Sequence, residues 1–188
     1  MTSQDPAAVW RAERRERLIG NLLAGRPAAF DVPGELDPRL AAWAADLAQS
    51  RPRNMILTGP VGTGKTWSVW HAAEHAVRIG YERLIVVATA TKFRRTVAPA
   101  TADPHEFGRY EAAGLLVLDD LGSARLSEWD LEHLAELVDT RWAARLPTAV
   151  TSNVTDIRGL LGERISSRLA DRALVIELDG PDLRREQP

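Results

Sequence analysis

Eight consecutive residues, Gly59 to Thr66, constrain the fold of this chain more than any other stretch. They read GPVGTGKT and fit the pattern G-x-x-x-x-G-K-[ST]. In this pattern glycines let the backbone turn its N–H groups inward around a polyphosphate, and the lysine and the hydroxyl complete the cradle. Only two of the 188 residues are lysine, so composition alone gives roughly one accidental match in a thousand. The stretch therefore predicts a phosphate-binding loop.

The flanking residues favour the same interpretation. The apolar run at 54–57 ends at Thr58 and predicts a strand, while Trp67–Ile79 has helical spacing. A loop between a strand and a helix N-terminus is where a phosphate is held. Trp67, in the first helical turn, favours packing over stacking on an adenine. The predicted nucleotide-binding residues are Gly59, Pro60, Val61, Gly62, Thr63, Gly64, Lys65, Thr66 and Trp67.

Composition excludes several classes of protein. The net charge of -2 excludes a generally basic protein that coats nucleic acid, although it permits a local basic patch. The absence of cysteine excludes disulfides, thiolate catalysis and cysteine-based zinc sites, and a reducing cytosol is expected. The longest apolar run, Leu84–Ala90, is far shorter than the roughly 20 residues that span a bilayer. We expect a cytoplasmic protein with no membrane partner.

Apolar runs alternate with helical patterns along the chain. Asp5 and Pro6 begin a predicted helix that ends near Ala24, and a second helix is expected over Asp37–Ala48. Four further strands are predicted at Leu84–Ala88, Leu115–Leu118, Thr148–Thr151 and Leu174–Leu178. Five buried strands alternating with helices imply a parallel α/β sheet. The expected organisation is an N-terminal helical extension over 1–25, a linker and helix over 26–53, and a core over 54–188.

A second chemical motif, LLVLDDLG, occupies Leu115–Gly122. An apolar strand that ends in two carboxylates places Asp119 and Asp120 at the carboxyl edge of the sheet, where open α/β folds bind ligands. Asp119 is expected to hold Mg²⁺ opposite the Thr66 hydroxyl, and Asp120 to orient or deprotonate the attacking water.

Two more segments are candidates for roles around the phosphates. PTAVTSN, residues 147–153, places Asn153 at a strand tip as a candidate sensor of the γ-phosphate, with Thr151 and Ser152 as lesser candidates; the alternative is an ordinary Asx turn or helix cap. In GERISSRLADR, residues 162–172, Arg164, Arg168 and Arg172 recur every four residues and predict one helix face. That face is either solvated and paired with acidic neighbours, or it supplies an arginine finger to another subunit's nucleotide.

These motifs, in this order, resemble those of AAA+ ATPases, and more closely the DnaC/IstB family of replicative helicase loaders and transposition helper ATPases. The resemblance extends over about residues 14–184. The segments that carry it are RRERLIGNLLAGRPAAF, GPVGTGKTW, LLVLDDLG, TSN, GERISSRLADR and DGPDLR.

The resemblance implies a P-loop NTPase with an AAA+ core and a five-stranded parallel sheet of order 5-1-4-3-2. It implies Lys65 on the β and γ phosphates, Asp119 with the metal, Asp120 as the base and Asn153 as the sensor. Arg168 matches the family's finger, supplied in trans, and Arg164 is the reserve candidate. Only ten residues follow Leu178, so no C-terminal lid domain is expected.

The family resemblance also predicts an extra helix between the second and third strands that helps to bind single-stranded DNA. Basic and aromatic residues in this region are available for phosphates and bases. The candidates are Lys92, Phe93, Arg94, Arg95 and Arg109, with Phe107 as a second aromatic. The alternative is an ordinary solvated helix whose phenylalanines lie in the core.

Together these features predict an ATPase that uses ATP or ADP and Mg²⁺, forms homo-oligomers through ATP at subunit interfaces and contacts single-stranded DNA. A loader of the hexameric replicative helicase is expected first. A transposition helper would share every motif and differ in its partner, a transposase. A nucleotide-binding adaptor without turnover and a P-loop kinase are the remaining alternatives.

Overall fold

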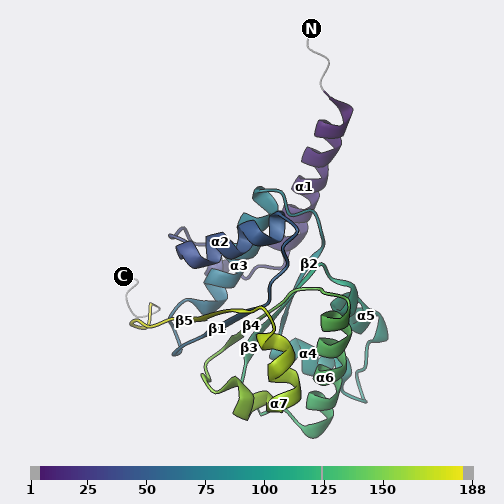
Figure 1. Cartoon of the computed structure of the whole chain (residues 1–188), viewed down its shortest axis with the longest axis vertical. Coiled ribbons are helices and arrows are strands. Elements are labelled where there is room, and N and C mark those ends of the chain that lie inside the picture. Colours follow the sequence, from purple (N-terminus) through teal and green to yellow (C-terminus); the bar gives the residue numbers. More distant parts are fainter. Residues whose placement is uncertain (1–4, 124, 184–188) are drawn as a thin grey trace.

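A five-stranded sheet forms the centre of the molecule in the computed structural model, which describes residues 5–123 and 125–183 (Figure 1). The strands lie in the order β2-β3-β4-β1-β5, and all neighbouring pairs are parallel. Their bounds are β1 Met55–Thr58, β2 Ile85–Thr89, β3 Leu115–Leu121, β4 Thr148–Ser152 and β5 Leu174–Glu177. This order is the predicted 5-1-4-3-2 counted from the opposite edge, so the predicted fold is confirmed.

The central strands are buried on both faces because helices cover both sides of the sheet. Every residue of β1 and β4 is buried, which is the pattern of parallel strands between two helical layers. β3 continues to Leu121, beyond the predicted end at Leu118. The reason is a register shift, after which pairing with β4 resumes between Leu121 and Ser152.

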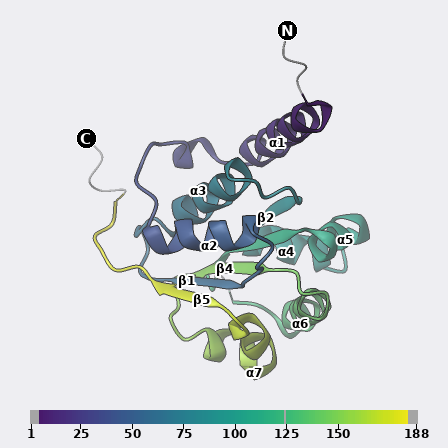
Figure 2. The same cartoon turned by 45° about the horizontal axis from the view of Figure 1, so that its top comes forward.

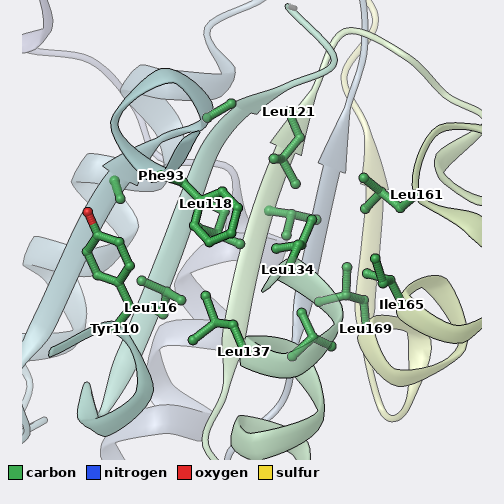
Figure 3. Packing of buried hydrophobic residues seen from close by; sticks show 14 of the residues in the cluster. Phe93, Tyr110, Leu116, Leu118, Leu121, Leu134, Leu137, Leu161, Ile165 and Leu169 are labelled. Atoms are coloured by element: carbon green, nitrogen blue, oxygen red, sulfur yellow. The ribbon is translucent and has the colours of Figure 1, made fainter. Parts of the chain in front are cut away.

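The helices form two layers, which Figure 2 shows on opposite sides of the sheet. The first layer contains α1 (Pro6–Ala24), α2 (Pro38–Ala48) and α3 (Lys65–Arg78). The second contains α4 (Ala90–Val97), α5 (Pro104–Ala112), α6 (Glu128–Ala143) and α7 (Ile157–Ala170). In the second layer Phe93, Leu134 and Leu169 belong to one hydrophobic cluster with Leu116 and Leu118 of β3 (Figure 3).

α1 extends away from the rest of the fold (Figure 1). Asp5 caps it by accepting a hydrogen bond from Ala7 N at 3.0 Å, and Pro6 begins the first turn. Leu22 is the buried residue of this helix, whereas Trp10 is 52% exposed. None of the helices in the described part of the chain is long and apolar enough to cross a membrane.

α7 differs from the helix expected over 162–172. Gly162 has φ 80° and interrupts the helix, which resumes and ends at Ala170. Arg172 follows in a turn with φ 54°. The prediction that three arginines share one helix face is therefore wrong for Arg172, because the helix stops before it.

Candidate nucleotide-binding site

The GPVGTGKT loop joins β1 to α3, at the carboxyl edge of the sheet. Gly64 has φ 86° and directly precedes the first residue of α3, a left-handed conformation that glycine adopts without strain. Gly59 has φ 143°, and a Cβ there would lie 2.2 Å from the carbonyl oxygen of Leu178. Only glycine permits the segment after β5 to pass this close to the loop.

Lys65 lies inside the loop, with 7% of its surface exposed. Its Nζ donates hydrogen bonds to Gly59 O at 2.7 Å and Pro60 O at 2.6 Å. Thr63 Oγ1 also donates to Pro60 O, at 2.9 Å, while Val61 points outward and is 55% exposed. The ammonium thus already lies at the mouth of the cradle predicted to hold the phosphates.

Thr66 and Asp119 meet although they are distant in sequence. Thr66 Oγ1 donates to both carboxylate oxygens of Asp119, at 3.1 Å each. Burial raises the pKa of the Asp119 carboxyl above its ordinary value, and Asp120 raises it further, although hydrogen bonds from Thr151 and Thr66 oppose the shift. A buried carboxylate beside a hydroxyl is a donor set that suits a hard divalent cation.

Asp120 and Asn153 also meet, at the ends of β3 and β4. Asn153 Nδ2 donates to Asp120 Oδ1 at 3.2 Å, and Asp120 has a left-handed backbone with φ 63°. This conformation turns consecutive aspartates in different directions, so that Asp119 contacts Thr66 and Asp120 contacts Asn153.

Thr151 has a larger place in the site than its sequence position indicated. Its Oγ1 donates to Asp119 Oδ1 at 2.6 Å and accepts from the Asp120 N–H at 2.8 Å. The sequence ranked Thr151 below Asn153 as a sensor. The pairing of β3 with β4 brings this hydroxyl between the two aspartates, and strand order is the only sequence signal that anticipates it.

The predicted finger residues lie away from the loop of their own chain. Asn54 Nδ2 donates to the backbone oxygen of Arg168 at 3.1 Å. Asn54 precedes β1, whereas the phosphate-binding loop follows it, so these features mark opposite edges of the sheet. The side chains of Arg164 and Arg168 both pair with Asp139 of α6.

The predicted DNA-binding residues lie on α4 and α5. Their four basic side chains lie at the surface, whereas Phe93 is buried. Lys92 and Arg109 both pair with Glu106, at 2.7 and 2.6 Å, and Arg94 pairs with Asp130 at 3.2 Å. Arg95 is exposed and has no side-chain partner among the described residues.

Phe93 belongs to the hydrophobic core. It is 0% exposed and packs against β3 (Figure 3). The prediction that Phe93 contacts DNA is therefore wrong, because the ring faces the sheet. Phe107 is partly buried against the same core.

Trp67 packs against the linker that precedes α2. Its Nε1 donates to Val32 O at 2.9 Å, and its ring stacks on His71 with centroids 4.0 Å apart. A Cβ on Gly34 would lie 2.6 Å from this ring. The Trp67 side chain therefore packs against the linker and against His71.

The segment after β5 passes over the phosphate-binding loop, which no local sequence signal indicated. Leu183 N donates to Gly62 O at 3.1 Å. A Cβ on Gly62 would lie 1.9 Å from Asp182 Oδ1, so an acidic side chain lies directly against the loop. Arg184, the last residue of the DGPDLR segment, lies outside the described residues.

Comparisons with known proteins identify the family of this chain. The family described as IstB-like ATP binding protein matches residues 28–180. The chain is 34% identical to the ATP-binding protein of insertion sequence IS1162 from Pseudomonas fluorescens over 132 residues, 68% of this chain and 55% of that protein. The match therefore spans little more than half the length of that relative.

Two solved structures have the same fold. The DnaC helicase loader has a TM-score of 0.65 at 19% identity, over 80% of this chain and 96% of that chain. The replication initiator DnaA, bound to AMPPCP and single-stranded DNA, has a TM-score of 0.61 at 20% identity, over 80% of this chain and 48% of that chain. Because the family match includes the loop, the paired aspartates and the parallel sheet, the chain belongs to the IstB-like ATP binding proteins, with an AAA+ core.

Proposed function

We propose that this protein is a Mg²⁺-dependent ATPase whose active site is completed by a neighbouring subunit. The observation that carries the proposal is the contact of Thr66 with Asp119 beside the Lys65 loop. A hydroxyl and a buried carboxylate at the mouth of a phosphate cradle are the parts that P-loop ATPases use to hold the metal on the β and γ phosphates.

Thr66 and Asp119 are the residues that would hold Mg²⁺. The ion usually binds one or two protein oxygens and completes its shell with phosphate oxygens and water. Burial penalises the charged form of Asp119 and raises its pKa, and a divalent cation would favour that charged form. When bound, Mg²⁺ neutralises charge that develops on the transferred phosphoryl group.

Asp120 is the proposed base, and Asn153 is the proposed sensor. The amide of Asn153 holds one oxygen of the Asp120 carboxylate at 3.2 Å, and the other remains to accept a proton from water. The left-handed backbone at Asp120 directs this carboxylate away from the metal ligand. Because the two carboxylates point in different directions, Asp119 can bind the metal while Asp120 accepts a proton.

Arg168 is the proposed finger, acting on the nucleotide of the next subunit. It lies near the amino end of β1, so it does not serve the loop of its own chain. An arginine that neutralises the transferred phosphoryl is worth about 10³ to 10⁵ in rate. ATP would therefore join subunits, and hydrolysis would separate them.

Single-stranded DNA is the proposed second ligand. A hollow of about 500 Å³ lies between α4 and the start of α6, and its lining includes Arg94, Arg95 and Trp129. Trp129 is 45% exposed, and an aromatic face among arginines suits stacked bases and phosphates. The DnaA structure of the same fold is bound to single-stranded DNA, which supports this choice of ligand.

The comparisons favour a transposase as the protein partner. The sequence pointed first to a helicase loader, but two relatives, one of them 34% identical, are named as ATP-binding proteins of insertion sequences. A helicase loader is the second candidate, supported by the fold match that covers 96% of the DnaC chain. Co-purification with the cognate transposase and with the replicative helicase, each in ATP and in ADP, separates the two candidates.

Two substitutions test the ATPase itself. Lys65→Ala is expected to abolish ATP binding, whereas Arg168→Ala is expected to bind ATP normally and to lose about 10³-fold or more in turnover. Arg39→Ala, on the exposed surface of α2, is the control. Wild-type turnover per subunit should rise with protein concentration. Full activity in dilute, monomeric Arg168→Ala protein would refute a finger supplied in trans.

A further inference from the structure

The side chain of Arg168 rests on an aromatic ring. Its guanidinium carbon lies 3.9 Å from the centroid of Trp142. Trp142 is in the last turn of α6 and is 40% exposed, whereas Leu134 and Leu137 of the same helix are buried. A guanidinium stacked on an indole face gains cation–π attraction and keeps its plane parallel to the ring.

Trp142 is itself held in place. Its Nε1 donates to Asp171 Oδ2 at 2.7 Å, and Asp171 is the C-cap residue that directly follows α7. The ring is thus bonded to the end of the same helix that carries Arg168. This bond fixes the orientation of the surface on which the guanidinium lies.

Asp139, three residues before Trp142 on α6, contacts Arg164 and Arg168 in different ways. Its Oδ2 accepts from Nε and Nη2 of Arg164, with the Nε bond at 3.0 Å. Its Oδ1 lies 3.4 Å from Nε of Arg168, an ion pair without a hydrogen bond. Asp139 therefore engages the fork of Arg164, but contacts Arg168 only at the base of its guanidinium.

The outer nitrogens of Arg168 remain available. Within residues 5–123 and 125–183, Nη1 and Nη2 of Arg168 have no hydrogen-bond partner. Arg168 is 38% exposed at its side chain, so these two donors reach the surface. A pair of parallel N–H donors is the group that binds phosphate oxygens bidentately.

We propose that Trp142 and Asp139 are positioning residues that orient Arg168 before it meets the nucleotide of the next subunit. A flexible arginine must lose rotamer freedom to make its contact, and a side chain already held in place loses less. The inference rests on the proposed function of Arg168, and it identifies Arg168 rather than Arg164 as the finger.

Mixtures of two inactive variants test this inference. Lys65→Ala subunits donate a finger but bind no ATP, and Arg168→Ala subunits bind ATP but donate no finger. Mixing them should restore ATP hydrolysis. Trp142→Leu added to the Lys65→Ala donor should lower the restored kcat about tenfold, leaving the KM for ATP unchanged. The same change in the Arg168→Ala subunit should leave the rate unaltered.

Conservative and control variants sharpen the result. Trp142→Phe in the donor keeps an aromatic face and should retain most of the restored rate. Asp139→Asn in the donor should lower it several-fold. Glu163→Gln removes an exposed carboxylate that pairs with Arg158 of α7, and it should have no effect.

The outcomes distinguish a failure of the finger supplied in trans from a failure of the positioning roles of Trp142 and Asp139. If the parent mixture restores no activity, the finger in trans is wrong. If the mixture is active but Trp142→Leu has no effect in the donor, or lowers the rate equally in both subunits, the positioning role of Trp142 is wrong. An unchanged or faster rate with Asp139→Asn in the donor would overturn the positioning role of Asp139.

Discussion

Arg141 illustrates how much one buried side chain contributes to this fold. It is 0% exposed, and its Nη1 donates to the carbonyl oxygens of Tyr110, Glu111 and Ala113 at the end of α5. Burial lowers the pKa of its guanidinium to about 10, so it stays charged at neutral pH. These bonds satisfy helix-end carbonyls that would otherwise be buried without donors.

Replacing Arg141 by methionine should therefore lower the free energy of unfolding by about 3 kcal/mol or more, because several buried carbonyls lose their donor. Urea unfolding followed by circular dichroism measures the change. Arg145→Met is the control, since Arg145 is exposed and has no side-chain partner among the described residues. A similar loss in both variants would contradict the role given to the buried bonds.

Thr151 makes contacts in the site that the sequence pattern did not indicate. It bonds to Asp119 Oδ1 and to the Asp120 N–H. Thr151→Val keeps the shape and removes both bonds, so we expect ATP turnover to fall about 10- to 100-fold and the Mg²⁺ requirement to rise. A Mg²⁺ titration of ATPase rate measures both effects. Thr155→Val, an exposed threonine on the following loop, should behave like the wild type.

At the level of elements, the strands were predictable because apolar runs of four or five residues, separated by helical patterns, indicate a parallel sheet. Their order was predicted from the resemblance to the DnaC/IstB family, and the structure has that order. Which face of α4 packs against the sheet was less predictable. Its pattern allows Phe93 either to face solvent with the arginines or to face β3, and only packing decides. The interruption at Gly162 also depends on tertiary structure, since a lone glycine is compatible with a continuous helix.

The start of α6 is fixed by a capping box between Ser127 and Asp130. Burial opposes the charge on Asp130, but bonds from Ser127 and Arg94 hold the pKa of its carboxyl below the ordinary value. A lowered folded-state pKa adds stability above the unfolded pKa, and this stability is lost as the pH falls through the folded pKa. Below the ordinary value near 3.8, the cap should weaken.

Asp130→Asn should accordingly cost about 1 kcal/mol of unfolding free energy near pH 7, and less at a pH below the lowered pKa of Asp130, where the wild-type carboxyl is protonated as well. Urea unfolding at the two pH values measures the difference. Asp46→Asn, which removes an ion-paired carboxylate from α2, provides a comparison. An equal cost of Asp130→Asn at both pH values would mean that the ionised cap does not stabilise α6.

At the level of the whole molecule, the candidate site draws on segments from across the chain. Thr66 of α3, Asp119 of β3 and Thr151 of β4 come together because β1, β4 and β3 are adjacent in the sheet. Strand order was sufficient to predict this meeting. The chain after β5 returns across the loop for a different reason, the close approach of Leu178 to Gly59 and of Asp182 to Gly62, which only three-dimensional structure reveals.

This return places the Asp182 carboxylate against the loop that is predicted to bind the phosphates. Asp182→Asn should tighten ATP binding about 3- to 10-fold at low salt, because a like charge beside the phosphates is removed, and the gain should shrink as salt screens the interaction. Titration with a fluorescent ATP analogue at low and high ionic strength measures it. Glu16→Gln, on the exposed side of α1, removes the same charge at a distance. If both variants tighten binding equally, net charge alone acts; weaker binding by Asp182→Asn would mean that the segment supports the loop for nucleotide rather than opposing it.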